Sequence, residues 1–166
     1  MDRKKLISNL IWVAAVVFLA WYFLWPVSLA DAMPEQEDIL VSVLATDAAG
    51  TNTQTELVLP AGSEAREQLQ ALLGQYSCYR TINPNNQNTT QGLAWNEKYL
   101  IRNESATAAI YTYGTSKILV NDDLLRMGWF NNNQALAFAR AIQNLLQQEN
   151  TGIVLKSTQV ISPAGG

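Results

Sequence analysis

The side chains that could carry chemistry in this chain are one cysteine, fourteen acids and a few arginines, because the sequence contains no histidine. Without histidine, neither a Ser-His-Asp nor a Cys-His arrangement can form, and the commonest metal ligand is missing. Cys78 and Arg80 share one face of a predicted strand, so the guanidinium could favour a thiolate. Nothing nearby could act as its base, and a free cysteine is more often a small buried residue. We predict no catalytic residue.

Three arginines on or near predicted strands form a second candidate group. If Arg80, Arg102 and Arg126 converge, they make a forked site for a carboxylate or a phosphate. In the alternative, each arginine pairs with an acid on an adjacent strand. The acids considered for this pairing are Glu97, Glu104 and Asp122.

Aromatic side chains form a third candidate group. Tyr111 and Tyr113 share a strand face, and further rings lie on neighbouring segments at Trp95, Tyr99 and Trp129. Flat rings with asparagines at the rim suit a sugar or a peptide, although such rings also favour half-buried sheet positions in general. The predicted ligand-binding residues are therefore Arg80, Arg102, Arg126, Trp95, Tyr111, Tyr113 and Trp129.

The acidic residues form only weak candidates for a metal site or for the catalytic carboxylates of a hydrolase. The best local group of oxygen ligands for calcium is Asn121-Asp122-Asp123, but adjacent acids of this kind more often form a turn. We predict no metal and no cofactor, since phosphate-binding and dinucleotide-binding glycine motifs are also missing. A hydrolase with paired carboxylates stays open as an alternative, because two acids distant in sequence can meet in space.

The elements that must position these residues begin with a membrane helix. Leu6 to Trp25 (LISNLIWVAAVVFLAWYFLW) is uncharged, and twenty helical residues span roughly 30 Å, the thickness of a hydrocarbon core. Basic residues precede it and acidic residues follow, so we expect a cytoplasmic N-terminus and an extracytoplasmic remainder. The alternative is secretion after signal cleavage near Ala32.

The remainder is acidic and has the pattern of a mixed α+β domain. Beyond Lys5 there are eight basic and thirteen acidic residues, so nucleic acid is not an expected partner. One cysteine allows no internal disulfide. We expect a cytoplasmic tail at 1–5, a transmembrane helix at 6–25, a linker at 26–37, the domain at 38–162 and a frayed tail at 163–166.

Hydrophobic periodicity predicts an antiparallel sheet packed with two helices. Apolar residues at helical spacing follow the N-cap Ser63 and recur from Ala135 to Leu146. Strands are predicted around 39–44, 53–59, 77–82, 93–102, 106–113, 117–121 and 153–161, whereas 122–130 is ambiguous between a turn and a short strand.

Short motifs in these elements carry a family resemblance. The strand pair, the helix Leu69-Gln-Ala-Leu-Leu73, the strand Tyr79-Arg80-Thr81 and Arg126-Met-Gly-Trp-Phe-Asn131 before the second helix resemble small membrane-anchored or lipid-anchored proteins of Firmicutes with no assigned function. The resemblance covers roughly Asp38 to Gln148. This chain lacks the anchor cysteine of the lipid-anchored members. The resemblance implies an extracytoplasmic α+β domain and supplies no catalytic residue.

Together these patterns favour a bacterial membrane-anchored binding or interaction module, not an enzyme. The expected partners are the membrane, through Leu6 to Trp25, and an envelope protein or glycan. The alternatives are an envelope hydrolase and a sensor subunit that acts through its transmembrane helix.

Overall fold

The computed structural model describes residues 3–47, 49–81, 97–112, 117–121, 123–128, 134–148 and 151–161. Within these ranges it contains three helices and a nine-stranded sheet in which all the strand pairs are antiparallel. The predicted α+β class is confirmed. The predicted frayed tail at 163–166 lies outside the described residues.

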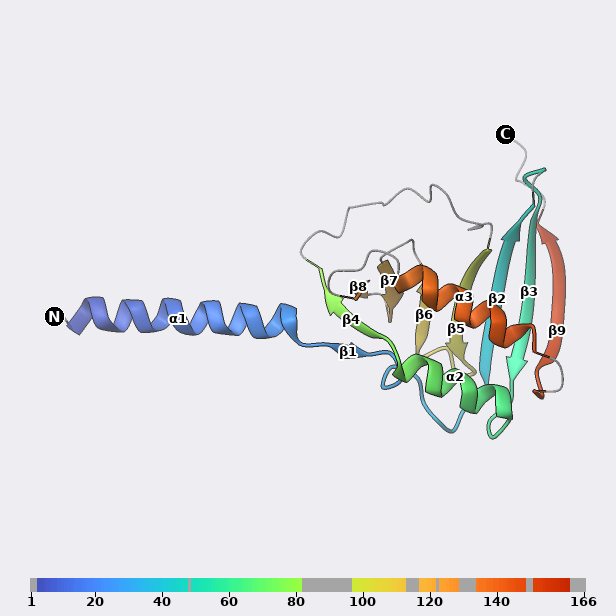
Figure 1. Ribbon diagram of the computed structural model, residues 1–166, viewed down its shortest axis with the longest axis horizontal. Helices are drawn as coiled ribbons and strands as arrows, with labels where there is room; N and C mark the ends of the chain where they lie inside the picture. The colour runs from blue at the N-terminus through green and yellow to red at the C-terminus, as the bar shows by residue number, and fades with distance from the viewer. Residues whose placement is uncertain are drawn as a thin grey trace.

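The first helix projects away from the rest of the chain. Helix α1 (Arg3–Leu24) is exposed along almost its whole length and is long and apolar enough to cross a membrane, with a mean hydropathy of 2.0. It ends where the Trp25 N–H still donates to the Trp21 carbonyl, because Pro26 cannot continue the helix. Figure 1 shows α1 as a rod beside a curved sheet.

The strands follow one another in a mixed order across the sheet. They are β1 (Val27–Ser28), β2 (Ile39–Thr46), β3 (Asn52–Leu59), β4 (Ser77–Arg80), β5 (Glu97–Asn103), β6 (Ala109–Thr112), β7 (Lys117–Val120), β8 (Asp123–Met127) and β9 (Val154–Ile161). Their spatial order is β1-β4-β8-β7-β6-β5-β2-β3-β9. The ambiguous 122–130 region thus contributes a strand, β8, that pairs with both β7 and β4.

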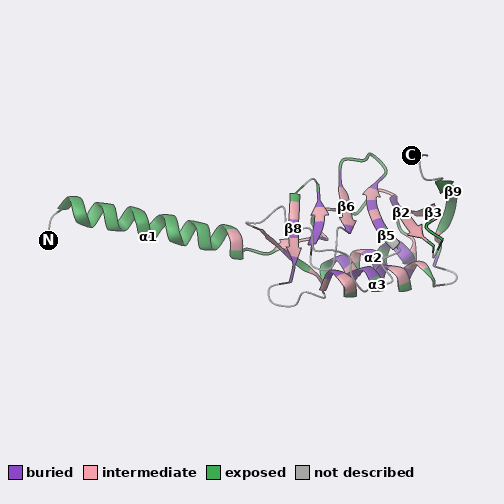
Figure 2. Ribbon diagram, turned by 90° about the horizontal axis from the view of Figure 1, so that it is seen from above, coloured by how far each residue is buried: buried purple, intermediate pink, exposed green. Residues whose placement is uncertain are grey.

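Two helices cover one face of the sheet, as predicted (Figures 1 and 2). Helix α2 (Glu64–Gly74) begins at Ser63, whose side chain accepts the Arg66 N–H, and helix α3 (Gln134–Leu146) buries a regular apolar stripe. Tyr76 meets Phe138 edge to face, with ring centroids 5.2 Å apart. The two helices therefore form one layer over the sheet.

The core lies between this helical layer and the inner face of the sheet. Because side chains alternate along a strand, directly paired residues project from the same face. Val41 lies opposite Ile101, and Ile101 lies opposite Ile110, and all three are fully buried. Continuous β-branched pairs of this kind give the sheet its apolar inner surface.

Residues 26–37, which we expected to be a linker, are packed against the domain. Val27 and Ser28 form β1, and Leu29 and Met33 are buried in the core. A carboxylate oxygen of Glu37 accepts hydrogen bonds from Asn103 and Ser105, which lower the pKa of this carboxyl, Ser105 most. Burial of apolar side chains in the core, and hydrogen bonds with α2 and with the β5–β6 turn, hold this segment against the domain.

Candidate functional site

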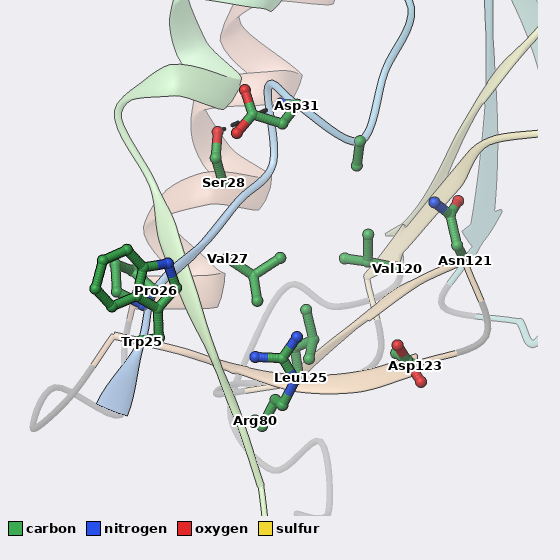
Figure 3. Close-up of a pocket in the computed structure, with 11 residues that line it drawn as sticks. Trp25, Pro26, Val27, Ser28, Asp31, Arg80, Val120, Asn121, Asp123 and Leu125 are labelled. Atoms are coloured by element: carbon green, nitrogen blue, oxygen red, sulfur yellow. Dashed lines mark hydrogen bonds between the residues drawn. The ribbon is translucent and has the colours of Figure 1, made fainter. Parts of the chain in front are cut away.

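A depression lies where α1 meets the sheet. It has a volume of about 390 Å³ and is lined by Trp25, Pro26, Val27, Ser28, Asp31, Ala32, Arg80, Val120, Asn121, Asp123 and Leu125. Figure 3 shows charged side chains of both signs around apolar Val27, Val120 and Leu125. We call this the junction pocket.

Residues of four strands, β1, β4, β7 and β8, line the junction pocket. Only two residues separate the end of α1 from strand β1, which pairs with β4 through Val27 opposite Cys78. Strand β4 in turn pairs with β8, with Arg80 opposite Leu125. Helix α1 is therefore joined to the sheet by a very short connection, and the strand that follows this connection is paired within the sheet.

Arg80 contacts the C-terminal end of helix α1. Its guanidinium carbon lies 4.6 Å from the centre of the Tyr22 ring, and its Nη1 donates to the Tyr22 carbonyl at 3.4 Å. The last carbonyls of a helix lack partners within the helix and carry partial negative charge, so a cation is favourable there. Arg80 is thus a contact between domain and helix, which local sequence did not predict.

Two carboxylates line other parts of the junction pocket. Asp31 follows β1, where its backbone N–H donates to Ser28 Oγ, and Asp123 begins β8; both are exposed. Within the described residues the ion pair closer than 4.0 Å is Arg102 with Glu56, so neither acid is paired directly with Arg80. The pocket therefore presents separated charges of opposite sign.

The structure does not bring the three predicted arginines together. Tyr79, not Arg80, lies opposite Arg126, so Arg80 and Arg126 project from opposite faces of the sheet. Arg102 lies on β5, three strands from β8, which corresponds to roughly 14 Å across the sheet. A convergent arginine site is ruled out by this register.

Arg102 has an acidic partner, though not one of those expected. Its Nη2 lies 3.4 Å from Glu56 Oε1, and Glu56 belongs to β3, beyond the intervening strand β2. The expected partner Glu104 instead lies in the turn after β5, and the side chain of Glu97 and all of Asp122 lie outside the described residues. Arg126 lies opposite Lys117, whose pKa is lowered by burial.

The predicted aromatic site falls largely outside the described residues. Tyr111 is half-buried on β6, opposite Leu100 and Leu119. Trp95, Tyr113 and Trp129 are not among the residues that the structure describes, so the sugar or peptide site stays a prediction. Tyr99 is buried in the core.

Cys78 is a buried apolar residue in this structure. It is fully inaccessible, and burial raises the pKa of its thiol to about 12. Arg80 is two residues away but engages Tyr22, so it does not favour a thiolate here. Burial and the raised pKa both disfavour a nucleophilic Cys78 at neutral pH.

The parts of the chain that the structure describes contain no cluster of three acidic or cysteine side chains suited to a metal. Of the group considered for calcium, Asn121 lies in a turn. Its Oδ1 accepts the Ala109 N–H, its own N–H donates to the Ala109 carbonyl, and its φ is 48°. The Asn121 side chain is therefore engaged by the backbone of the neighbouring strand.

Two features were missed in the sequence. Arg66 lies on the buried face of α2 and donates from Nη2 to the Pro34 carbonyl and from Nη1 to Gln70. Its spacing from Leu69 and Leu73 could have revealed it, since 66, 69 and 73 share one helical face. Strand β9 was predicted, but its position at the edge of the sheet was not.

Comparison with protein-family models, with curated proteins and with solved structures gives no match. The resemblance to small anchored proteins of Firmicutes therefore stays a prediction.

Proposed function

We propose that this chain is a single-pass membrane protein whose domain lies outside the cytoplasmic membrane and binds an extended segment of an envelope protein. The apolar α1 supports the anchoring, and the basic residues at its start support the orientation. The observation that carries the binding role is strand β9.

Strand β9 is a long and unprotected edge. It has eight residues and pairs with β3 on one side, and no described strand pairs with its other side. Its exposed apolar side chains include Leu155 at 62% and Val160 at 67%. Such an edge presents free backbone N–H and C=O groups, which an added strand can satisfy.

The side chains of β9 add an apolar strip beside this edge. The register shifts between Glu56 and Leu57, which leaves Lys156 without a direct partner in a β-bulge. Because of this bulge, Leu155 lies opposite Leu57 and Val160 opposite Thr53, so both project from one face. An added strand with apolar residues at matching positions would cover both side chains.

The position of β9 favours a partner protein over a second copy of this chain. Figure 1 shows β4 beside α1 and β9 at the far end of the sheet, in agreement with the strand order. Antiparallel pairing of two β9 strands has its two-fold axis normal to the sheet. The second α1 would then point in the opposite direction, away from the shared membrane.

Site-specific photo-cross-linking in intact membranes tests this proposal. A photoreactive residue at Thr158, which is exposed on β9, should cross-link to one continuous segment of an envelope protein. Combined Leu155→Lys and Val160→Lys should reduce the yield roughly tenfold, because two apolar cross-strand contacts are lost and two charges are introduced. Ala137→Lys, at an exposed position of α3, is the matched control and should leave the yield unchanged.

Two results would reject binding at β9. One is a cross-linking yield that the double lysine variant does not change. The other is a cross-linked product that contains two copies of this chain. Either result would leave the anchoring by α1 intact.

One observation favours the sensor subunit as a second candidate. Arg80 and the β1–β4 pairing couple α1 directly to the sheet. Replacing Leu6 to Trp25 by an unrelated apolar span should leave a pure anchor active and should disable a helix-mediated sensor. The hydrolase alternative retains Asp31 and Asp123 in the junction pocket, but both carboxylates are exposed, whereas a general acid is usually desolvated.

A further inference from the structure

We propose that the junction pocket binds the headgroup of an aminophospholipid, with the lipid phosphate at Arg80 and the primary ammonium at Asp31 and Asp123. This inference rests on the membrane placement of α1 given above, and it adds a ligand and a site that are independent of β9. The argument combines the position of the pocket, its charges and its size.

The junction pocket lies at the level where lipid headgroups are found. Trp25, at the outer end of α1, lines the pocket, and Tyr22 one turn earlier contacts Arg80. Trp and Tyr at the end of a membrane helix lie in the interfacial region. If α1 spans the bilayer, the pocket opens directly beside the headgroups of the outer leaflet.

The separated charges select a zwitterion. Arg80 is the cationic lining residue, and Asp31 and Asp123 are the anionic ones, without a direct ion pair between them. A purely anionic headgroup would neutralise Arg80 but would face two carboxylates. A zwitterion can place its phosphate at Arg80 and its ammonium at the two carboxylates at the same time.

Arg80 is held in a suitable orientation for a phosphate. Its contact with the Tyr22 ring and its hydrogen bond to the Tyr22 carbonyl restrict the guanidinium, and this hydrogen bond uses one of its five N–H donors. The side chain is only half-buried, so the remaining donors can reach a ligand. A guanidinium with free donors can bind two phosphate oxygens at once.

The size of the pocket and its acids refine the choice of headgroup. A volume of about 390 Å³ is at the lower end of small-molecule sites, which suits a headgroup and not a whole lipid. A primary ammonium donates N–H hydrogen bonds to carboxylates, whereas a trimethylammonium has no N–H and is usually held by an aromatic cage. We therefore expect phosphatidylethanolamine to bind better than phosphatidylcholine.

Lipid retention by the full-length chain tests the inference. The chain would be inserted in nanodiscs that contain equal amounts of phosphatidylethanolamine, phosphatidylcholine and phosphatidylglycerol, and the lipids that stay bound after transfer to detergent would be measured by native mass spectrometry. Phosphatidylethanolamine should be enriched in the retained lipid. Free phosphoethanolamine added in a parallel sample tests whether a soluble headgroup displaces the lipid.

Matched variants assign the retention to the pocket. Arg80→Gln should reduce the preference for phosphatidylethanolamine roughly tenfold, since a charge-assisted hydrogen bond is lost. Asp31→Asn with Asp123→Asn should remove the discrimination against phosphatidylglycerol. Arg140→Gln and Glu64→Gln, which change exposed charges on α3 and α2, should alter neither preference. Slow labelling of Cys78 by a thiol reagent verifies that each variant is folded, because this side chain is buried.

The possible failures are distinguishable. Equal retention of the three lipids by an inserted chain would overturn the headgroup site and leave the anchor and β9 untouched. Displacement by free phosphoethanolamine at concentrations far below those of the lipid would assign the site to a soluble zwitterion and overturn the lipid. A chain that does not insert in nanodiscs would overturn both this inference and the proposed membrane anchoring.

Discussion

Arg80 shows how one side chain can join two parts of a molecule. A cation over an exposed aromatic ring contributes about 0.5–1 kcal/mol, and a cation at a helix C-terminus contributes about 0.3–1 kcal/mol. These are small energies, and their main effect is on orientation. The sheet and α1 are connected by this contact and by the short segment before β1. A rotation of α1 should therefore shift the position of β1 and β4.

Gly128 is a residue at which the backbone requires glycine. Its φ is +71°, which strains any residue with a Cβ, whereas the Cβ itself would meet only the flexible end of the Gln134 side chain, which can move aside. Gly128→Ala should therefore reduce the free energy of unfolding by about 1–3 kcal/mol. Chemical denaturation of the full chain in detergent would measure the change.

Gly74 provides the matched control for Gly128. It is the last residue of α2, its φ is not positive, and no atom lies within 4 Å of an added Cβ. Gly74→Ala should raise the free energy of unfolding by about 0.5–1 kcal/mol, because alanine favours a helix. If both alanine variants shift stability in the same direction, this account of the two backbones is wrong.

At the scale of elements, the helices were easier to predict than the connections. The apolar stripe of α3 repeats over almost four turns, so its buried face followed from spacing alone. Segment 26–37 has only two deeply buried apolar residues, Leu29 and Met33, and no period can be established from two positions. Its packing depends on α2, which begins thirty residues later, so the local sequence indicated a spacer.

Leu29→Ala tests whether this segment is part of the core. Leu29 is fully buried, so its truncation should reduce the free energy of unfolding by about 2–5 kcal/mol. Gln36→Ala, at an exposed position of the same segment, should change it by less than about 0.5 kcal/mol. Equal stability of the two variants in denaturation experiments would restore the linker interpretation.

The order of the strands in the sheet could not be predicted from the sequence pattern. Most strands were predicted near their observed positions, but the pairing of β2 with β5 joins residues about sixty positions apart. Ile39 and Asn103 become neighbours only through this non-local pairing. For the same reason Arg102 and Glu56 could not be matched in advance, and neither Asp31 nor Asp123 could be assigned to one pocket.

At the scale of the whole molecule, the junction pocket and strand β9 lie at opposite ends of the sheet. The junction pocket is beside α1, and β9 is the strand farthest from α1 (Figure 1). With α1 in a membrane, the pocket faces the lipid surface and β9 points away from it. This separation would let the chain hold its orientation at the membrane while β9 remains accessible to a partner.

The orientation across the membrane can be measured with single cysteines. Glu64→Cys places a thiol on the exposed face of α2, and Lys4→Cys places one before the apolar part of α1, where two of the three basic residues remain. In intact cells, a membrane-impermeant maleimide should label Glu64→Cys, whereas Lys4→Cys should react only after permeabilisation, because basic residues stay in the cytoplasm.

The natural Cys78 is the internal control of this experiment. It is inaccessible, and burial raises the pKa of its thiol to about 12, so almost no thiolate is present at pH 7 and the unmodified chain should stay unlabelled until it is denatured. Labelling of Lys4→Cys in intact cells would reverse the proposed orientation. Release of labelled Glu64→Cys protein into the medium as a shorter chain would instead establish cleavage near Ala32. Labelling of membrane-bound, full-length Glu64→Cys alone is the outcome that an uncleaved anchor with an outer domain requires.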